Sequence, residues 1–488
     1  MNAAFALLFV ALGQPVESRT LTVQMTFSKK VAAEPFTGRV FLIAARSSIS
    51  GTPPNQSWFK PFPFFAQNVR DWRPDEPLVF KPQHAFPVML DKLPSEKLYL
   101  QAVMDLDRGG MNCLTSPGNL YSKAILLDPK DPPEGPLTFV IDQVVQERTF
   151  KETDRVKLVD IPSKLLSDFH KKPMRLRAGV ALPKSFATEP NQQYPVIYEI
   201  PGFGGNHFGA LFSGSRDRTD VAGVEMIHVT LDPNCRTGHH VFADSANNGP
   251  YGRALVEELI PHIEATYRAV AKPGGRFLTG HSSGGWSSLW LQVTRPEFFG
   301  GVWSTAPDPV DFRDFQRIDL YAAKANMFTD EKGERRPIAR RGGEAVLFYK
   351  PFSDMEVVMG RGGQLWSFEA VFSPKGTNGQ PLPLWDRKTG AVDPKVAESW
   401  RRYDIRHVLE QNWAKLAPKL AGKLHIYMGG EDTFYLEGAT RLLGESLKNL
   451  GSDAVVEIFP GKDHGSLMTS ALRERMAREM AETFKKAM

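Results

Sequence analysis

Through the C-terminal part of the chain, short apolar runs alternate with longer segments in which apolar residues recur about every fourth position. One such segment, 253–268, carries Leu255, Leu259, Ile263 and Tyr267 along one face, as expected for a helix with one buried side. Strands that alternate with helices form a mostly parallel sheet covered on both sides. The pattern therefore predicts an α/β domain whose strands are 195–200, 226–231, 276–279, 302–304, 424–428 and 455–459.

The N-terminal region has a different pattern. Residues 21–27 alternate between apolar and polar side chains, as a half-buried strand does, and 38–44 and 98–104 are further strand candidates. Prolines and glycines separate these runs, which is typical of an antiparallel β-sandwich. We therefore expect a β-sandwich-like accessory domain at 19–145, followed by the α/β domain at 156–488.

The strongest chemical signal is Gly280-His281-Ser282-Ser283-Gly284, between the predicted strand 276–279 and a helical segment, 286–294. That segment stops just ahead of Pro296, as helices before proline tend to do. A G-x-S-x-G motif between strand and helix is typical of a nucleophile elbow. The glycines allow a strained turn that presents the Ser282 hydroxyl at the carboxyl end of the sheet. The motif alone also occurs by chance, so its interpretation depends on suitable partners.

A serine hydroxyl becomes a nucleophile when a base removes its proton and an acid orients that base. In hydrolases with this motif, the acid and then the histidine follow the serine in the chain. Asp432 follows the predicted strand 424–428, and His464 lies in the loop after the next one. Because loops at one edge of a parallel sheet converge, we predict a triad of Ser282, Asp432 and His464. Glu431, the neighbour of Asp432, is the alternative acid.

A glycine-rich loop, Pro201-Gly202-Phe203-Gly204-Gly205-Asn206, follows the predicted strand 195–200. In this chemistry one oxyanion donor comes from the residue after the nucleophile and another from an early strand–helix loop. The expected donors are therefore the N–H of Ser283 and that of Phe203 or Gly204. Taken alone, the loop does not exclude a simple flexible turn.

From about Val156 to its C-terminus the chain resembles the esterase branch of the α/β-hydrolases that contains enterochelin-esterase-like and feruloyl-esterase-like enzymes. The resemblance rests on the serine motif, the Pro-Gly-Phe-Gly-Gly loop and the segments 176–183, 258–264 and 296–300. It implies an α/β-hydrolase fold and a serine esterase or related acyl hydrolase, with no metal or organic cofactor. The loop begins Pro-Gly where the family often has His-Gly, and a long insertion precedes the acid. Because of these two departures, the resemblance does not identify the substrate.

The insertion runs from 308 to 413, between two predicted strands, and is rich in aromatic residues. Long loops in compact enzymes are usually functional or disordered, and the aromatic content argues against disorder. We predict a lid over Ser282, with His281, Trp366 and Trp385 lining the substrate pocket. The alternative is that the insertion is structural padding.

Length and composition fit a multidomain enzyme. The chain has 488 residues, of which 42% are hydrophobic, so two or three domains with substantial cores are expected. The formal net charge of +5 is small and forms no runs, which argues against nucleic-acid binding. Cys113 and Cys235 could pair only if they are adjacent in space, which the sequence does not decide. His239 and His240 lie near Cys235, but adjacent side chains diverge, so no metal site is predicted.

The N-terminus has features of an export signal. Residues 3–12 are apolar but too few to span a bilayer, and small residues follow at a possible cleavage site. The first basic residue is Arg19, so the usual positive leader is missing. We predict a signal peptide at 1–18, export to the periplasm or medium, and no membrane span. The alternatives are a frayed strand or a misassigned start.

Together these patterns predict a serine hydrolase that cleaves a carboxylic ester, small or polymer-linked, through an acyl-enzyme. A peptidase or acyltransferase could use the same three residues, although no sequence feature indicates a peptide-binding site. A non-catalytic binding protein on a hydrolase scaffold is the third possibility. The presence of Ser282, Asp432 and His464 argues against it.

Overall fold

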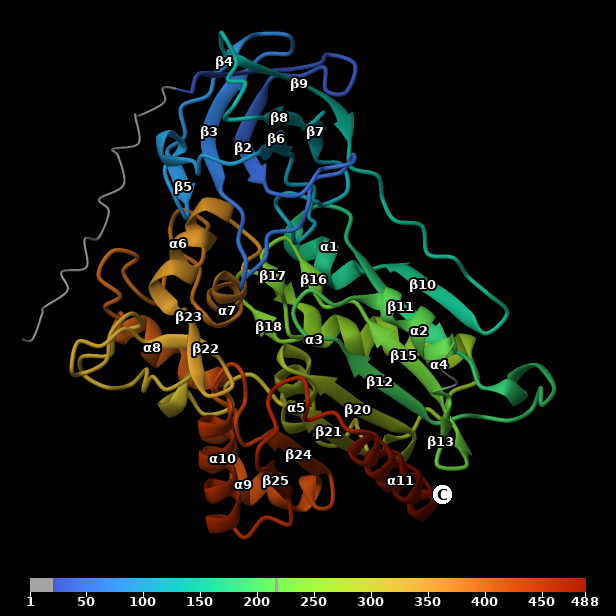
Figure 1. Ribbon diagram of the computed structural model, residues 1–488. Coiled ribbons are helices and arrows are strands. Elements are labelled where there is room, and N and C mark those ends of the chain that lie inside the picture. The colour runs from blue at the N-terminus through green and yellow to red at the C-terminus, as the bar shows by residue number, and fades with distance from the viewer. Residues whose placement is uncertain (1–20, 216–217) are drawn as a thin grey trace, which may run out of the picture. The chain divides into compact units, whose positions relative to one another are not determined.

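The computed structural model describes residues 21–215 and 218–488 (Figure 1), so the predicted signal peptide at 1–18 lies outside the described residues. The chain divides into two compact units. The described part of the first unit comprises 21–54, 62–105 and 120–144, and the second comprises 55–61, 106–119 and 145–488. Two segments that lie within the predicted accessory domain, 55–61 and 106–119, thus belong to the second unit.

The first unit is rich in strands. Its strands are β1 (Val23–Phe27), β2 (Phe36–Ala45), β3 (Phe64–Trp72), β4 (Leu78–Val79), β5 (His84–Phe86), β6 (Leu98–Asp105), β7 (Leu120–Ser122), β8 (Ile125–Leu127) and β9 (Leu137–Val144). Hydrogen bonds join them into one nine-stranded sheet in the order β4-β1-β9-β7-β6-β2-β3-β5, with β8 beside β6.

One pairing in this sheet departs from the antiparallel arrangement that we predicted. β1 and β9 run parallel, with Met25 opposite Phe139, whereas the other pairings are antiparallel. The alternating pattern of β1 does hold, because Val23, Met25 and Phe27 are buried while the residues between them are not. Alternation determines which face of a strand is buried, but it contains no information on the direction of its partner.

The second unit is built on an eight-stranded sheet in the order β10-β11-β15-β12-β20-β21-β24-β25 (Figure 1). These strands are β10 (Val156–Pro162), β11 (Arg175–Ala181), β12 (Val196–Ile200), β15 (Ile227–Leu231), β20 (Arg276–His281), β21 (Gly301–Thr305), β24 (Leu424–Gly429) and β25 (Val455–Phe459). β10, β11 and β15 pair antiparallel, and the remaining pairings, from β15 to β25, are parallel.

Four two-stranded hairpins accompany the sheet, formed by β13 (Asp220–Val221) with β14 (Val224–Glu225), β16 (Asn234–Cys235) with β17 (Gly238–His239), β18 (Asp244–Ser245) with β19 (Gly249–Pro250), and β22 (Pro337–Arg341) with β23 (Glu344–Phe348). The helices are α1 (Lys164–His170), α2 (Ala210–Ser215), α3 (Tyr251–Ala254), α4 (Ile260–Thr266), α5 (Ser283–Thr294), α6 (Tyr349–Met359), α7 (Gln364–Phe372), α8 (Pro394–Trp400), α9 (Ile405–Leu420), α10 (Glu437–Asn449) and α11 (Ser470–Ala487).

The predicted helix 253–268 contains an irregularity. A π-helical turn, Leu255–Leu259, connects α3 to α4, whose second residue is Pro261. Proline lacks the N–H that would continue the regular helical hydrogen bonds, and a wider turn accommodates that loss. Leu255, Leu259 and Ile263 are nevertheless all buried, so the apolar face persists through the irregular turn.

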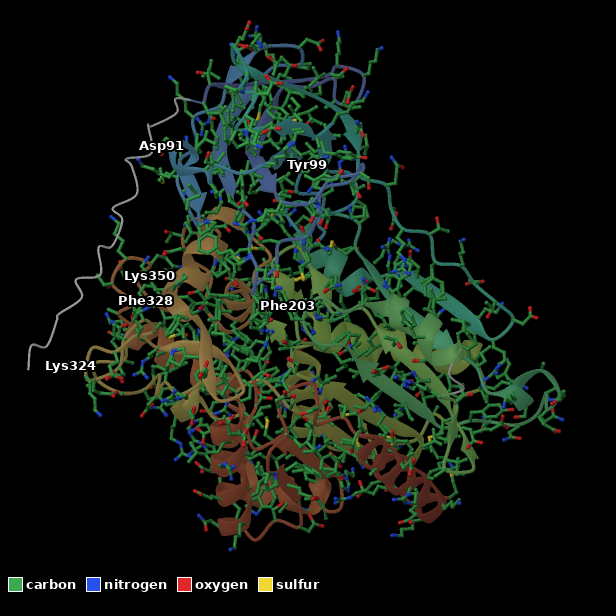
Figure 2. All side chains as sticks on the ribbon, viewed as in Figure 1. Asp91, Tyr99, Phe203, Lys324, Phe328 and Lys350 are labelled. Atoms are coloured by element: carbon green, nitrogen blue, oxygen red, sulfur yellow. The ribbon has the colours of Figure 1, made fainter. Side chains whose placement is uncertain are left out.

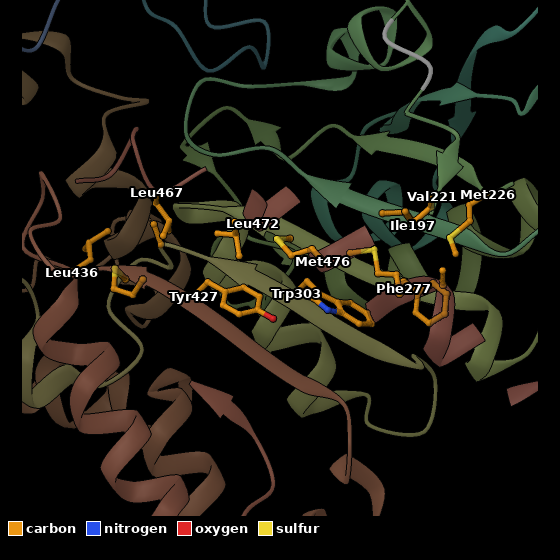
Figure 3. Packing of buried hydrophobic residues seen from close by; sticks show 14 residues of the cluster. Ile197, Val221, Met226, Phe277, Trp303, Tyr427, Leu436, Leu467, Leu472 and Met476 are labelled. Carbon is orange, nitrogen blue, oxygen red and sulfur yellow. The ribbon is translucent and has the colours of Figure 1, made fainter. Parts of the chain in front are cut away.

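Helix α11 packs against one face of the sheet (Figure 3). Trp303 of β21 and Tyr427 of β24 are fully buried there, in the same cluster as Met476 of α11. Buried polar atoms normally need partners. The Glu479 carboxylate accepts hydrogen bonds from the Trp303 indole N–H at 2.8 Å and from the Tyr427 hydroxyl at 2.6 Å. The apolar contacts and these two hydrogen bonds fix the C-terminal helix beside the strands that lead to the site.

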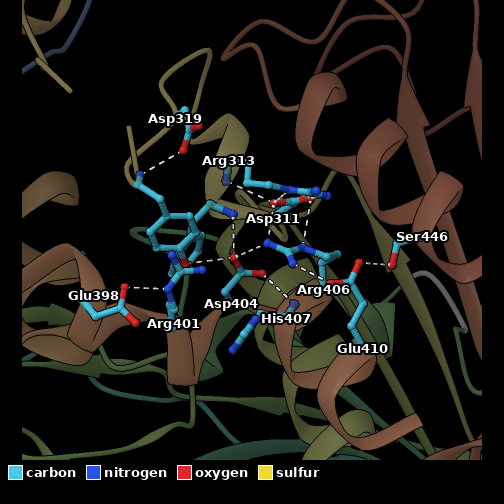
Figure 4. Close-up of polar contacts among 12 residues, drawn as sticks. Asp311, Arg313, Asp319, Glu398, Arg401, Asp404, Arg406, His407, Glu410 and Ser446 are labelled. Carbon is cyan, nitrogen blue, oxygen red and sulfur yellow. Dashed lines mark hydrogen bonds and ion pairs between the residues drawn. The ribbon is translucent and has the colours of Figure 1, made fainter. Parts of the chain in front are cut away.

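The 308–413 insertion is folded and contains β22, β23, α6, α7 and α8. Figure 2 labels three of its residues, Lys324, Phe328 and Lys350, and the Lys350 ammonium lies 5.5 Å from the centroid of the Phe328 ring. A buried ionic cluster joins the start of the insertion to α9 (Figure 4). In that cluster Arg406 lies 3.3 Å from both Asp311 and Asp404, and both carboxyl groups are fully buried.

Replacing Arg406 with methionine should destabilise the second unit by about 3–5 kcal/mol, because Asp311 and Asp404 would lose their buried cation. The midpoint of urea unfolding, followed by tryptophan fluorescence, should therefore fall. Lys415→Met is the matched control, because Lys415 is an exposed cation on the same helix, and it should shift the midpoint little. Equal shifts in the two variants would contradict a stabilising role for the ionic cluster.

Two further questions from the sequence concern the pairing of the cysteines and the presence of a membrane-spanning helix. Cys113 and Cys235 are both buried, and no disulfide joins them. Among the described residues, no helix has the length and apolar character needed to cross a bilayer.

Candidate active site

Ser282 lies on the turn between β20 and α5, in a strained backbone conformation. Its φ is 61° and its ψ −126°, a combination that L residues rarely adopt. The turn is possible because its flanking residues lack side chains. A Cβ on Gly280 would lie 2.1 Å from the carbonyl oxygen of Gly284, and one on Gly284 would lie 1.8 Å from that of Ile200. The motif therefore forms the sharp strand-to-helix turn that the sequence predicts.

His464 follows β25 and reaches the carboxyl group of Asp432, which follows β24. His464 Nδ1 lies 2.7 Å from Asp432 Oδ2, so the ring donates to the carboxylate. Asp432 is fully buried, and its Oδ1 accepts a second hydrogen bond, from the Phe434 N–H at 2.8 Å. Glu431 is exposed. It is therefore Asp432, and not Glu431, that contacts the histidine.

The loop that carries His464 is shaped by its neighbour Asp463. The exposed Asp463 carboxylate accepts hydrogen bonds from the N–H groups of Gly465, at 3.1 Å, and Ser466, at 2.7 Å. These bonds close a tight turn, which is a frequent role for aspartate. Asp463 thus positions the histidine loop, and its carboxylate is engaged in that turn.

The two imidazoles beside Ser282 have opposite pKa shifts, although the ring centroids of His281 and His464 are only 4.5 Å apart. Burial, together with the charge of His464, lowers the pKa of His281 to about 4. Burial also acts to lower the pKa of His464, but the hydrogen bond and the charge of Asp432 outweigh it and raise that pKa above the ordinary value. Of the two rings, His464 is therefore the one suited to accept a proton.

The glycine-rich loop after β12 lies against the serine turn. A Cβ on Gly202 would lie 3.0 Å from the carbonyl oxygen of His281 and 3.3 Å from Ser282 Cβ. Within the described chain, neither the Phe203 nor the Gly204 N–H donates a hydrogen bond. Ser283 is the first residue of α5, where a helix leaves its N–H groups without intrahelical acceptors. Unused amide donors from both segments are therefore near Ser282.

The same loop is held in place by side chains that the sequence did not indicate. His239 Nε2 donates to the Pro201 carbonyl oxygen at 2.9 Å, and its Nδ1 accepts from the Val241 N–H at 3.0 Å. Burial lowers the pKa of His239 to about 4, so the ring is neutral and both nitrogens have defined roles. Asn234 Nδ2 donates to the Gly205 carbonyl oxygen at 3.0 Å. The sequence indicates His239 only as a metal-ligand or loop candidate, since a contact with the backbone of a distant segment has no sequence signature.

A cavity of about 260 Å³ opens beside Ser282. His281, Ser282 and His464 line it together with three polar side chains, those of Asp308, Gln316 and Gln364. The rest of its wall is mostly apolar and consists of Trp58, Gly202, Phe203, Ile338, Leu347, Phe352, Phe368 and Phe434. Figure 2 labels Phe203 among these residues.

Trp58 was missed because its segment, 55–61, lies between two strands of the first unit in the sequence but belongs to the second unit. Its ring centroid lies 5.6 Å from that of Phe203, 5.3 Å from that of Phe352 and 6.1 Å from that of Phe434. Contacts between residues so distant in the sequence have no local pattern. Trp58 thus contributes an aromatic wall that no periodicity could reveal.

Our assignment of Trp366 and Trp385 to the cavity wall is corrected by the structure, whereas His281 does line it. Gln364 and Phe368 face the cavity from α7, and residues four apart share one side of a helix, so Trp366 points elsewhere. Trp385 is 3% exposed and packs beneath the Arg387 guanidinium, at 3.8 Å. Aromatic residues of the insertion do line the cavity, but they are Phe352 and Phe368 rather than the two tryptophans.

Asp308 is a buried acid in this wall that the sequence marked only as the start of the insertion. Its Oδ2 accepts from the Ser283 hydroxyl at 2.5 Å, and Gln364 Nε2 lies 3.4 Å from the same oxygen. Burial raises the pKa of Asp308 to about 6, although the Ser283 hydrogen bond and the charge of His464 act in the opposite direction. Within the described chain, no three His, Cys, Asp or Glu side chains gather where they could hold a metal ion.

The family described as "Putative esterase" matches residues 171–457, more than half of the chain. The match includes Ser282 and Asp432 and ends shortly before His464. No curated protein matches the chain in sequence.

Similar solved structures include two ferulic acid esterases and one S-formylglutathione hydrolase. A ferulic acid esterase is 15% identical, with a TM-score of 0.43 over 68% of this chain and 99% of its own. An S-formylglutathione hydrolase from Agrobacterium tumefaciens is 17% identical, with a TM-score of 0.43 over 67% and 95%. A CE1 ferulic acid esterase from Anaeromyces mucronatus, solved with ferulic acid, is 16% identical, with a TM-score of 0.35 over 69% and 94%. Because the family match extends from just before β11 into β25 and covers more than half of the chain, this chain belongs to the Putative esterase family of the α/β-hydrolases.

Proposed function

We propose that this protein is a serine esterase that cleaves a carboxylic ester through an acyl-enzyme. Ser282 is the nucleophile, His464 the general base and Asp432 the acid that orients it. The backbone N–H groups of Ser283 and of Phe203 or Gly204 form the oxyanion hole. The observation that carries the proposal is the contact of 2.7 Å between His464 and Asp432, beside a serine whose φ is 61°.

Each step of the reaction has a residue suited to it. His464 Nε2 takes the proton of the Ser282 hydroxyl as its oxygen attacks the ester carbonyl carbon. The carbonyl oxygen then carries the negative charge, and fixed N–H donors stabilise it. The alcohol leaves with the proton from His464, and the acyl group stays on Ser282. Water, activated by the same histidine, then releases the acid and restores the serine.

Asp432 contributes by holding the imidazole. Its carboxylate accepts the Nδ1 hydrogen of His464, which leaves Nε2 free as a base, and it stabilises the imidazolium that forms during attack. His281 Nδ1 lies 3.0 Å from the Thr305 hydroxyl rather than from a carboxylate, and with its pKa lowered to about 4 by burial the ring stays neutral at the pH where His464 gains a proton. We assign His281 to the cavity wall.

The insertion is proposed to shape the substrate pocket. It supplies Ile338, Leu347, Phe352 and Phe368 to the cavity wall, in addition to the polar residues Asp308, Gln316 and Gln364. An apolar wall next to the nucleophile favours an ester with a compact apolar group on that side, because burial of apolar surface contributes binding free energy.

Purified protein should hydrolyse 4-nitrophenyl esters of short acids and leave the matching 4-nitroanilides uncleaved. The esterase mechanism needs only an alcohol leaving group, whereas an amide also requires protonation of a poorer leaving amine. Initial rates from the release of nitrophenol and nitroaniline, on the same acyl groups, measure the difference. Faster release of nitroaniline would favour a peptidase, and release of neither product would overturn the esterase proposal.

A further inference from the structure

A groove in the second unit adjoins the cavity beside Ser282. We call it the methionine groove, because three methionines line it, and its volume is about 410 Å³. These methionines are Met111, Met355 and Met359. The rings of Trp58 and Phe203 line both the groove and the cavity, so the two hollows meet at this pair of rings. The groove is therefore within reach of a substrate whose ester group lies at Ser282.

Helix α6 forms one side of both hollows. Phe352 lines the cavity, and Met355 and Met359 line the groove. Residues three and four positions apart lie on one side of a helix, so a single face of α6 extends from the cavity into the groove. Methionine side chains are flexible and adapt to apolar groups of different shape. The groove thus continues the apolar wall of the cavity away from Ser282.

The lining of the methionine groove is uncharged and mostly apolar. None of the described residues that line it is an aspartate, glutamate, lysine or arginine. The oxygens of its three amide side chains already accept hydrogen bonds from the protein. Asn55 Oδ1 accepts from Asn112 Nδ2 at 2.9 Å. Asn112 Oδ1 accepts from the Leu114 N–H at 2.8 Å, and Gln56 Oε1 accepts from the Ser57 N–H at 3.0 Å. A charged ligand group would lose its water here without gaining a counter-charge, whereas an apolar group is stabilised by burial.

The position of His464 indicates which half of the ester enters the groove. His464 lines the cavity but not the groove, and in the proposed mechanism it gives its proton to the departing alcohol oxygen. The alcohol therefore leaves on the cavity side. Gly204, whose loop supplies oxyanion donors in that mechanism, lines the groove. The acyl chain extends from the carbonyl carbon on the side opposite the alcohol, and it is thus directed toward the groove.

We propose that the methionine groove binds the acyl part of the ester and selects an apolar chain of about six to ten carbons. The proposal rests on the esterase function argued above and specifies the acyl class of its substrate. An engineered cavity of about 150 Å³ holds benzene, so the groove of about 410 Å³ has room for such a chain. The rings of Trp58 and Phe203 would contact the methylenes nearest the ester, and the methionines would contact the rest.

The test measures how kcat/KM depends on acyl length. The substrates are 4-nitrophenyl butanoate, hexanoate and octanoate, which share their leaving group and reacting bond. A fourth ester, 4-nitrophenyl 6-methoxyhexanoate, matches octanoate in length but carries an ether oxygen. Each buried methylene should raise kcat/KM by about 2- to 4-fold, because its burial adds binding free energy. The value for the ether should lie about tenfold below that for octanoate, since its oxygen loses hydrogen bonds to water.

Variants locate the effect in the groove. Met111→Gln and Met359→Gln each replace a half-buried methionine with a polar side chain of similar size, and each should lower the octanoate-to-butanoate ratio by about tenfold. Met488→Gln is the matched control, because Met488 is exposed at the end of the same unit, and it should preserve the ratio. If one groove variant fails to fold, the other variant and the wild-type series still decide the question.

Alkyl acetates distinguish the two halves of the ester. Butyl and octyl acetate place the longer chain on the alcohol, and the release of acid at constant pH measures their hydrolysis. The ratio of octyl to butyl acetate should be the same in the wild type and in Met359→Gln. A preference for octyl acetate that Met359→Gln abolishes would mean that the groove binds the alcohol, and it would overturn the acyl assignment.

Failure of the groove is distinct from failure of the esterase function. Hydrolysis of butanoate with no gain at hexanoate or octanoate would overturn the groove alone. A gain that survives both glutamine variants, or that the ether shares in full, would also overturn it. If no ester is hydrolysed, the esterase function fails, and the proposal for the groove fails with it.

Discussion

Replacement of Ser282 by alanine is expected to lower ester hydrolysis by about 10⁴- to 10⁶-fold, because the nucleophile that carries the acyl group is lost. The residual rate over water would come from substrate binding and the oxyanion donors. Steady-state kcat/KM on a 4-nitrophenyl ester, with circular dichroism to verify the fold, measures the effect. The fold should persist, because alanine also fits the turn and removes only the side-chain oxygen of a half-buried residue.

Ser283→Ala is the control for this experiment. It removes the neighbouring hydroxyl from the same motif but keeps the backbone amide, so the variant should still turn over ester. Loss of activity in Ser283→Ala with full activity in Ser282→Ala would mean that the nucleophile has been assigned to the wrong residue. The two serines differ in geometry, since Ser283 Oγ is already engaged with the buried Asp308.

The second large effect is expected at His464 and Asp432. His464→Ala should lose activity by about as much as Ser282→Ala, because serine and base act as one unit. Asp432→Asn should lower kcat by about 10⁴-fold, since an amide no longer fixes the imidazole tautomer. Glu431→Gln is the matched control and should change little, because Glu431 is exposed and does not contact the histidine. The reverse result for Glu431 and Asp432 would refute our choice of acid.

The pH profile provides an independent check on the same pair. The neutral imidazole is the active form, so activity is present above the pKa of His464 and is lost as pH falls through it. The hydrogen bond and charge of Asp432 outweigh burial and raise that pKa, so the acid limb of kcat/KM should have its midpoint above 6.5. In Asp432→Asn, burial dominates, and the residual activity should have its midpoint at a lower pH. An unchanged midpoint would contradict the pairing.

Strands and motifs could be predicted because both have local signatures. The run 455–459 coincides with β25, and the other predicted core strands overlap β12, β15, β20, β21 and β24. By contrast, β10 and β11 were not predicted, and they make the sheet mixed. β10 lies at the edge and shows a weak alternation, with two intermediate residues between its buried ones, so its pattern does not identify a strand.

The candidate site likewise contains residues that the sequence predicted and residues that it did not. Asp432 and His464 were placed at strand ends, and parallel strands bring their loops to one edge, where the two residues meet. Trp58, His239 and Asp308 could not be recognised in advance, since each contributes through contacts with distant parts of the chain. The roles of these three residues depend on tertiary contacts, which the sequence pattern does not reveal.

Covalent labelling of the intact protein tests the central claim most directly. The protein is treated with a fluorophosphonate, digested, and its peptides are sequenced by mass spectrometry. We predict one phosphonyl group, attached to Ser282, with activity lost in proportion to labelling and no adduct in Ser282→Ala. An adduct on another serine that accounts for the loss of activity, or full ester hydrolysis by protein completely labelled at Ser282, would contradict the account.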